Sequence, residues 1–308
     1  MVVVCTAKVL LLLRLMNIML AYSAVIFFSV LQSATTKLFN RNSSNSSVFN
    51  ATKALSSFLM FLLMAINGFS LHLPTVLYGV FYGLSLCLSM YTGYKALCLG
   101  PMALTSMLVS FSIIIPLLWG ITLGNESLNM LRIAALIFLF ISIILTNGDK
   151  LVSLAVARLK ESSSEKHGGL WFFFVGMTFL SNGICSILQK QHQAVYPEAY
   201  SEEFMFFAML VCAVIFSALT VSRNSVAEIK STKGKWLGAV SGIANGLANF
   251  FTLVLAGSEN ASILFPCISA GTLLGAIICG RFLFKEKLKI NHYFALVFGI
   301  LAVVFLKI

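Results

Sequence analysis

Charged residues are scarce in this chain. Only 10% of its 308 residues are charged, and only ten residues are acidic. A soluble globular domain carries about 25% charged residues. The chain is instead 59% hydrophobic, with a mean hydropathy of +0.96, which is more apolar surface than one protein core can hide. The composition therefore predicts an integral membrane protein, with the lipid bilayer as its solvent.

Motifs of enzymes, cofactors and metal sites are absent from the sequence. It contains no HExxH, no GxSxG, no P-loop and no glycine-rich dinucleotide turn after a strand. No cluster of acidic residues suits a metal ion. The seven cysteines form no CxxC pair, and most lie in apolar stretches, where cysteine behaves as a small hydrophobic side chain. The sequence predicts neither an enzyme nor a bound cofactor or metal.

The positive net charge of +11 does not indicate nucleic acid as a partner. Most Lys and Arg residues lie in short connections between apolar segments, where they set membrane orientation. A membrane helix needs about 20 mostly apolar residues. This rule predicts ten spans, at 12–35, 51–69, 74–98, 102–123, 129–147, 169–190, 203–221, 236–256, 261–283 and 290–307.

The longest connection, 148–168, divides these spans into five and five. An odd number of spans in each half forces the second half to insert upside down relative to the first. The predicted fold is an all-α integral membrane protein whose ten transmembrane helices form two inverted five-helix repeats. Residues 1–147 form the first repeat, 148–168 the linker, and 169–308 the second repeat, within one structural unit.

A repeated pattern supports this division. Residues 79–128 and 238–288 both start with two glycines four residues apart, contain a break between two apolar helices and end near a glutamate. The matching residues are Gly79 and Gly83 with Gly238 and Gly242, and Glu126 with Glu286, at offsets of 159 and 160. Membrane proteins made of two equivalent halves commonly bind their substrate between the halves.

The repeated segments also carry a family resemblance. The run 94–106, Tyr-Lys-Ala-Leu-Cys-Leu-Gly-Pro-Met-Ala-Leu-Thr-Ser, is followed by Pro116 in mid-helix and by Leu-Gly-Asn-Glu-Ser-Leu at 123–128. The second copy has Pro266 in mid-helix and Phe-Lys-Glu-Lys-Leu at 284–288. These features resemble the EamA-type transporters of the drug/metabolite transporter superfamily, over residues 73–148 and 233–307.

The resemblance implies a ten-helix inverted-repeat carrier for small organic metabolites, often an exporter. It also implies a central cavity lined by the first, third, fourth, sixth, eighth and ninth spans, with the fifth and tenth at the periphery. The resemblance further implies that both termini lie in the cytoplasm, as they are usually drawn for this family. The charges favour the opposite orientation, because 16 of the 21 Lys and Arg residues fall after odd-numbered spans when Lys37, Lys53 and Lys95 are counted there.

Amides and hydroxyls are the main polar groups inside the predicted spans, since the acids and histidines fall in connections or near helix ends. Asn245 and Asn249 are one helical turn apart and share a face. An unpaired buried amide costs about 2–7 kcal/mol, so these groups meet either a partner helix or a substrate. The candidate substrate-binding residues are Gln32, Ser85, Ser89, Ser110, Asn182, Asn245, Asn249 and Thr272.

Hydrogen bonding between helices is the alternative for every member of this set. We favour that alternative for the hydroxyls, which can bond their own helix backbone, and hold the two interpretations about equal for the asparagines. Helix-packing and kink roles are expected for the residues Gly79, Gly83, Gly238, Gly242, Pro116 and Pro266. Glu126 and Glu286 are expected to bond helix N-termini or loops, Lys190 to extend toward the membrane surface, and Trp171 and Trp236 to anchor spans at it.

Taken together, these features predict a secondary transporter that moves a small polar or amphipathic organic metabolite by alternating access. A lipid flippase or scramblase of the same fold is the alternative, and a scaffold without transport is a third. Expected partners are a small-molecule substrate and the bilayer. A coupling ion, H+ or Na+, and a homodimer are left open. The expected location is a bacterial plasma membrane.

Orientation can be tested directly. If the excess of Lys and Arg marks the cytoplasmic side, a cysteine introduced by Ser163→Cys is labelled only from the cytoplasm. Intact cells and inside-out vesicles treated with a membrane-impermeant thiol reagent distinguish the two sides. Labelling of Ser163→Cys in intact cells would establish the family orientation instead.

Overall fold

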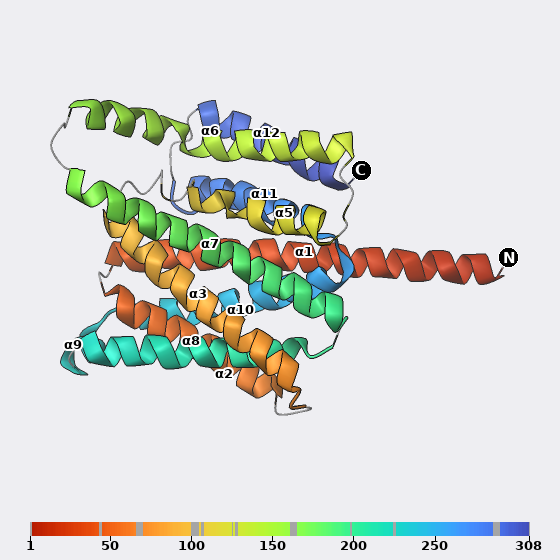
Figure 1. Ribbon diagram of the computed structural model, residues 1–308, viewed down its shortest axis with the longest axis horizontal. Coiled ribbons are helices and arrows are strands. Elements are labelled where there is room, and N and C mark those ends of the chain that lie inside the picture. Colours follow the sequence, from red (N-terminus) through yellow and green to blue (C-terminus); the bar gives the residue numbers. More distant parts are fainter. Residues whose placement is uncertain are drawn as a thin grey trace.

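The computed structural model describes residues 2–42, 45–65, 70–99, 105, 108–124, 126, 129–160, 165–197, 199–223, 226–285 and 290–307. Within these residues every regular element is a helix (Figure 1). The helices are α1 Val2–Asn42, α2 Ser46–Ala65, α3 Leu73–Leu99, the short 3-10 helix η1 Phe111–Ile113, α5 Ile114–Thr122, α6 Met130–Lys160, α7 Glu165–Val195, α8 Ser201–Arg223, α9 Val226–Ser231, α10 Lys235–Ser258, α11 Ala261–Phe282 and α12 Ile290–Lys307.

Seven helical segments in the described part of the chain are long and apolar enough to cross a membrane. They are Asn17–Phe39, Ser46–Met64, Leu73–Ala96, Gly169–Val195, Ser201–Arg223, Lys235–Ser258 and Ala261–Phe282. Three shorter apolar helices, Leu108–Thr122, Met130–Thr146 and Ile290–Leu306, lie within or beside the other expected spans. The chain is therefore an all-helical, multi-pass membrane protein by the length and composition of its helices.

The helices run back and forth along one direction (Figure 1). The packed pairs include α1 with α10, α3 with α7, α2 with α10, α3 with α8, α2 with α8 and α6 with α12. Most of these pairs join a helix from before residue 148 to one from after residue 168, so the two halves of the sequence share one packed core.

The four glycines of the repeated pattern lie where helices approach closely. A Cβ atom at Gly79 would be 2.7 Å from the Phe204 carbonyl oxygen, and one at Gly83 would be 2.6 Å from that of Ala208. In the other half, a Cβ atom at Gly242 would overlap the Lys53 carbonyl oxygen, and Gly238 faces the same helix, α2. Small residues allow this approach of backbones, which is a main source of helix association in lipid.

Several features differ from the expectations. Residues 148–160 continue α6, and residues 165–168 already belong to α7, so most of the expected linker is helical. Lys37, Lys53 and Lys95 lie inside α1, α2 and α3 rather than in connections. They therefore no longer add to the excess of connection lysines and arginines from which the orientation was predicted. Trp171 does not lie at the surface of the protein as an anchor would, since it is only 1% exposed, packs against Ala96 and Val175, and donates from its indole nitrogen to the Thr105 hydroxyl at 2.9 Å.

The structure also places the expected surface anchor Trp236 and the two expected kink residues, Pro116 and Pro266. Trp236 is 66% exposed, as a membrane-surface anchor would be. Pro266 is buried inside α11, and Pro116 is buried in the first turn of α5, directly after the 3-10 turn η1. The expected break at Gly100-Pro101 and the residue Glu286 lie outside the described residues.

The close glycine contacts predict a specific stability difference. Gly242→Ala should destabilise the protein by about 1–3 kcal/mol, because the added methyl group overpacks the α2–α10 contact. Gly176→Ala is the matched control, since a Cβ atom there has nothing within 4 Å and alanine favours a helix by about 0.5–1 kcal/mol. Thermal unfolding in detergent micelles should show a lower midpoint for the first variant only. Equal midpoints would contradict the close packing of α10 on α2.

Candidate functional site

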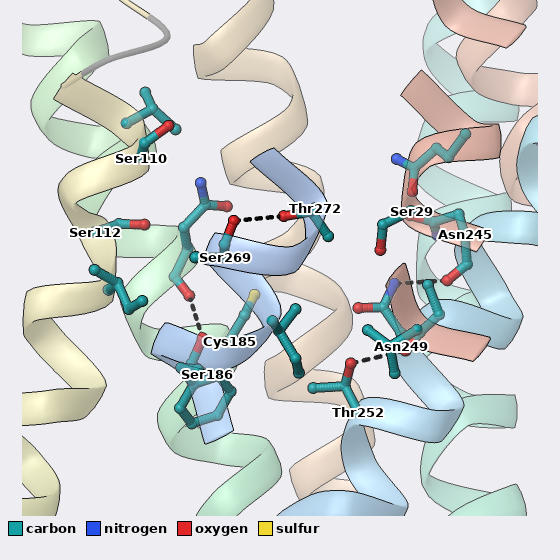
Figure 2. Close-up of a pocket in the computed structure, with 18 of the residues that line it drawn as sticks. Ser29, Ser110, Ser112, Cys185, Ser186, Asn245, Asn249, Thr252, Ser269 and Thr272 are labelled. Atoms are coloured by element: carbon teal, nitrogen blue, oxygen red, sulfur yellow. Dashed lines mark hydrogen bonds between the residues drawn. The ribbon is translucent and has the colours of Figure 1, made fainter. Parts of the chain in front are cut away.

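A cavity of about 800 Å³ lies at the centre of the helices (Figure 2). Its lining comes from α1, α3, residues 109–113, α7, α10 and α11, with Ile143 of α6 as an addition. These segments hold the six spans that the family resemblance places around a central cavity. The size is within the range of about 300–1,000 Å³ usual for small-molecule sites.

The cavity brings together six of the eight candidate residues. They are Gln32, Ser110, Asn182, Asn245, Asn249 and Thr272. Ser85 and Ser89 are not part of the lining. Ser85 is half-buried, and the Ser89 hydroxyl donates to Asn182 Oδ1 at 2.5 Å, which places Ser89 behind the cavity wall.

One group of lining side chains is held firmly by the protein itself. The Tyr82 hydroxyl donates to Asn249 Oδ1 at 2.8 Å and accepts a hydrogen bond from Gln189 Nε2 at 3.3 Å. Asn249 Nδ2 in turn donates to the Asn245 carbonyl oxygen at 2.8 Å. Both ends of the Asn249 amide are therefore occupied, and its main role is to link α3, α7 and α10.

A second group has hydrogen-bonding capacity to spare. Asn245 is only 7% exposed, yet it lines the cavity, and its side-chain amide makes no hydrogen bond within the described part of the chain. The same holds for the Gln32 amide, while Asn182 uses only its Oδ1. Buried amides are normally paired, so the Asn245 amide, with the half-buried Gln32 and Asn182 amides on the same cavity, points to water or a solute there.

The polar groups lie on opposite walls. In Figure 2, Ser29, Asn245 and Asn249 stand on one side of the cavity, and Ser112 and Ser186 stand on the other. The hydroxyls of Ser29 and Ser112 have no hydrogen-bond partner among the described residues. A solute between the walls could therefore be bonded from both sides at once.

The electrostatic character of the cavity is neutral. Among its described lining residues none is charged, and the remainder of the surface is apolar, as at Val25, Leu86 and Phe265. The described residues also contain no group of three His, Cys, Asp or Glu side chains that could hold a metal ion. The site can offer amide and hydroxyl hydrogen bonds and apolar contact to a ligand.

The cavity is closed at one end and open at the other. Beyond Val25 and Phe265, toward the turn between α10 and α11, the side chains of Leu255, Ala256 and Leu264 are 0–1% exposed and fill the space between helices. Exposure rises in the opposite direction, and the lining residues Ser33, Ser110 and Ala276 are exposed.

Tyr82 is the residue that the sequence analysis missed. It lies in the repeated glycine pattern, directly before Gly83, but a single tyrosine in an apolar span does not reveal which way it points. Gln189, Ser186 and Ser29 belong to polar stripes at helical spacing on α7 and α1, and that spacing was a usable signal for them.

No family model and no curated protein sequence matches this chain. A solved structure, described only as a crystal structure of a protein, is similar to it with a TM-score of 0.71. The similarity covers 94% of this chain and 97% of that chain at 12% sequence identity. At this identity the likeness concerns the fold alone.

The linking role of Tyr82 can be tested by removing its hydroxyl. Tyr82→Phe should lower stability by about 1–3 kcal/mol, because Asn249 Oδ1 and Gln189 Nε2 lose a buried partner. Tyr78→Phe on the same helix is the control, since the Tyr78 hydroxyl has no hydrogen bond within the described residues. Thermal unfolding in detergent compares the two variants. An equal effect of both substitutions would mean that the Tyr82 hydroxyl does not stabilise the site.

Proposed function

We propose that this protein is a secondary carrier that moves a small, uncharged or zwitterionic polar metabolite across a membrane through its central cavity. The observation that carries the proposal is the pairing of an uncharged cavity with unused amides of Asn245, Gln32 and Asn182. Keeping unpaired amides in a membrane protein is costly, and a carrier for polar solutes needs such groups at mid-depth.

The proposal includes ten spans arranged as two inverted repeats. Support comes from the helix pairs. If α1 corresponds to α7, α2 to α8, α3 to α10, α5 to α11 and α6 to α12, then exchanging the two halves converts the pair α1–α10 into α7–α3. The same exchange converts α2–α10 into α8–α3 and α1–α11 into α7–α5, and all six of these pairs are in contact. Such internal symmetry is the usual basis of alternating access around a fixed site.

The neutral lining sets the class of substrate. A net ionic solute would need a counter-charge in a low-dielectric cavity, and the described lining has none. A solute with several hydroxyl, amide or carbonyl groups and an apolar portion would match both kinds of surface. We infer that any proton or sodium coupling uses groups outside this lining or the substrate itself.

The lipid-handling alternative fits the cavity less well. A lipid route needs a groove that opens sideways to the bilayer and accepts an apolar chain. Here six helical segments contribute to the lining, and polar side chains come from opposite walls. This arrangement favours a solute that is enclosed between the halves.

Asn245→Leu tests the proposal. The substitution removes the amide but keeps the Asn245 backbone carbonyl that accepts from Asn249 Nδ2, so the Tyr82 framework should remain. Purified protein in proteoliposomes is screened with amino acids, nucleosides and small amines, with and without a pH gradient. For the solute that the parent protein transports, we expect Asn245→Leu to abolish uptake with little change in thermal unfolding.

Ser85→Ala is the control for this experiment, because Ser85 lies on the same helix as Tyr82 but outside the lining. It should leave transport unchanged. Normal transport by a variant that carries both Asn245→Leu and Asn249→Leu would mean that these amides serve only helix packing, and would overturn the proposed site.

A further inference from the structure

The turn between α10 and α11 is held by two oppositely charged side chains. Lys190 Nζ, on α7, donates to the carbonyl oxygens of Ala256 at 2.9 Å and Glu259 at 2.6 Å. The Glu126 carboxylate, which follows α5, accepts from the backbone N–H groups of Ala261 at 2.7 Å and Ser262 at 2.8 Å. Both side chains therefore bond main-chain atoms of one short segment, 256–262.

Each charge matches the helix end that it contacts. The last carbonyls of α10 form the negative end of that helix, and the first N–H groups of α11 form a positive end. The residue before α11, Asn260, makes no side-chain capping bond, so Glu126 supplies the cap from another part of the chain. Gly120 makes room for it, since a Cβ atom there would be 2.8 Å from Glu126 Oε2.

This segment is also the closed end of the cavity. Ala256 and Ala261, at its two sides, are 0% exposed and belong to the apolar cluster that separates the cavity from that end of the protein. For the cavity to open there, α10 and α11 must move away from α7 and from the residues after α5. The contacts of Lys190 and Glu126 are charge-assisted bonds that oppose such a movement.

The first half of the chain has a lysine at the corresponding place. Asn182, Ser186, Gln189 and Lys190 on α7 repeat the spacing of Ser29, Ser33, Thr36 and Lys37 on α1, at a constant offset of 153. Lys37 has a different contact, because its Nζ lies 4.4 Å from the centre of the Phe284 ring. The two lysines thus occupy matching helix positions at opposite ends of the cavity.

We propose that Lys190 and Glu126 form a latch that holds the α10–α11 turn shut while the cavity is open at its other end. This inference rests on the alternating access of the proposed function. Release of both contacts, with the ammonium and the carboxylate passing to water, accompanies opening at the latch end. Lys190 and Glu126 set the balance between the two states and do not contact the solute.

The test uses a cysteine-free parent protein carrying Ser29→Cys in the cavity, reconstituted in vesicles of known orientation. An impermeant thiol reagent is added to one side at a time. Ser222→Cys, at the end of α8, reports the open end, and Met130→Cys, at the start of α6 and 85% exposed, reports the latch end. In the parent, the cavity cysteine should be labelled only from the side that labels Ser222→Cys.

Lys190→Met and Glu126→Gln should each raise labelling of the cavity cysteine from the latch end by about tenfold or more, because each removes charge-assisted hydrogen bonds made only in the closed state. Gly120→Ala should have the same effect with both charges kept, since the methyl group displaces the carboxylate. Lys190→Arg, which keeps a cation, and Lys37→Met, the counterpart in the other half, should produce no increase.

Folded latch variants that stay labelled only from the open end would overturn the proposal, and so would an equal increase in Lys37→Met. If Lys190→Met or Glu126→Gln fails to fold, Gly120→Ala decides by the same criterion. The labelling needs no substrate, so failure of the latch can be told apart from failure of the transport assay. Increased labelling from the latch end, without any transported solute, would support the latch alone. Transport without increased labelling would support the carrier and reject the latch.

Discussion

Hydrocarbon offers no hydrogen-bond partner, and this constraint governs the whole molecule. Backbone groups must be satisfied within each segment, which leaves helices for an open chain in lipid. Hydroxyl side chains meet the same demand locally, as when Thr252 donates to the Ala248 carbonyl oxygen and Thr92 to that of Leu88. Lys190 and Glu126 meet it by bonding helix ends. An amide side chain has both donors and an acceptor, and one turn of its own helix rarely satisfies all of them. The positions of amides therefore mark places where the protein needs polar groups inside the membrane.

The amides near the cavity fall into two groups on this criterion. Asn249 and Gln189 are both bound to Tyr82, and Gln189 also donates to the Asn249 carbonyl oxygen, so they make α3, α7 and α10 one rigid wall. Asn245 and Gln32 keep free capacity and face the cavity from neighbouring helices. A rigid polar frame behind a set of unused groups is the arrangement that preorganises a binding site, because the frame fixes where the free groups point before a ligand arrives.

Sequence alone predicts the parts of this arrangement that depend on local periodicity. Hydropathy identifies the helices, and the spacing of Asn245 with Asn249 identifies a shared polar face. The rest depends on contacts between residues far apart in the chain. Asn249 is occupied because Tyr82, 167 residues away, donates to it, and no pattern around either residue indicates that pairing. Ser89 lies behind Asn182, and Trp171 is buried against Thr105, for the same reason: the neighbouring helix decides which way each face points.

The two halves of the chain follow a similar pattern, but in any one conformation they must make different contacts. If both halves made the same contacts at the same time, both ends of the cavity would be equally closed or equally open, and a solute could be trapped or could leak. Here the same residue type at the same helix position does different things, since Lys190 bonds the end of α10 while Lys37 lies over the Phe284 ring. In the alternating access that we propose, the two states would differ in which charged side chain reaches a helix end. On this proposal, a small change in the bonding of a few such groups would be enough to shift the balance between the states, because matching helix pairs pack in both halves.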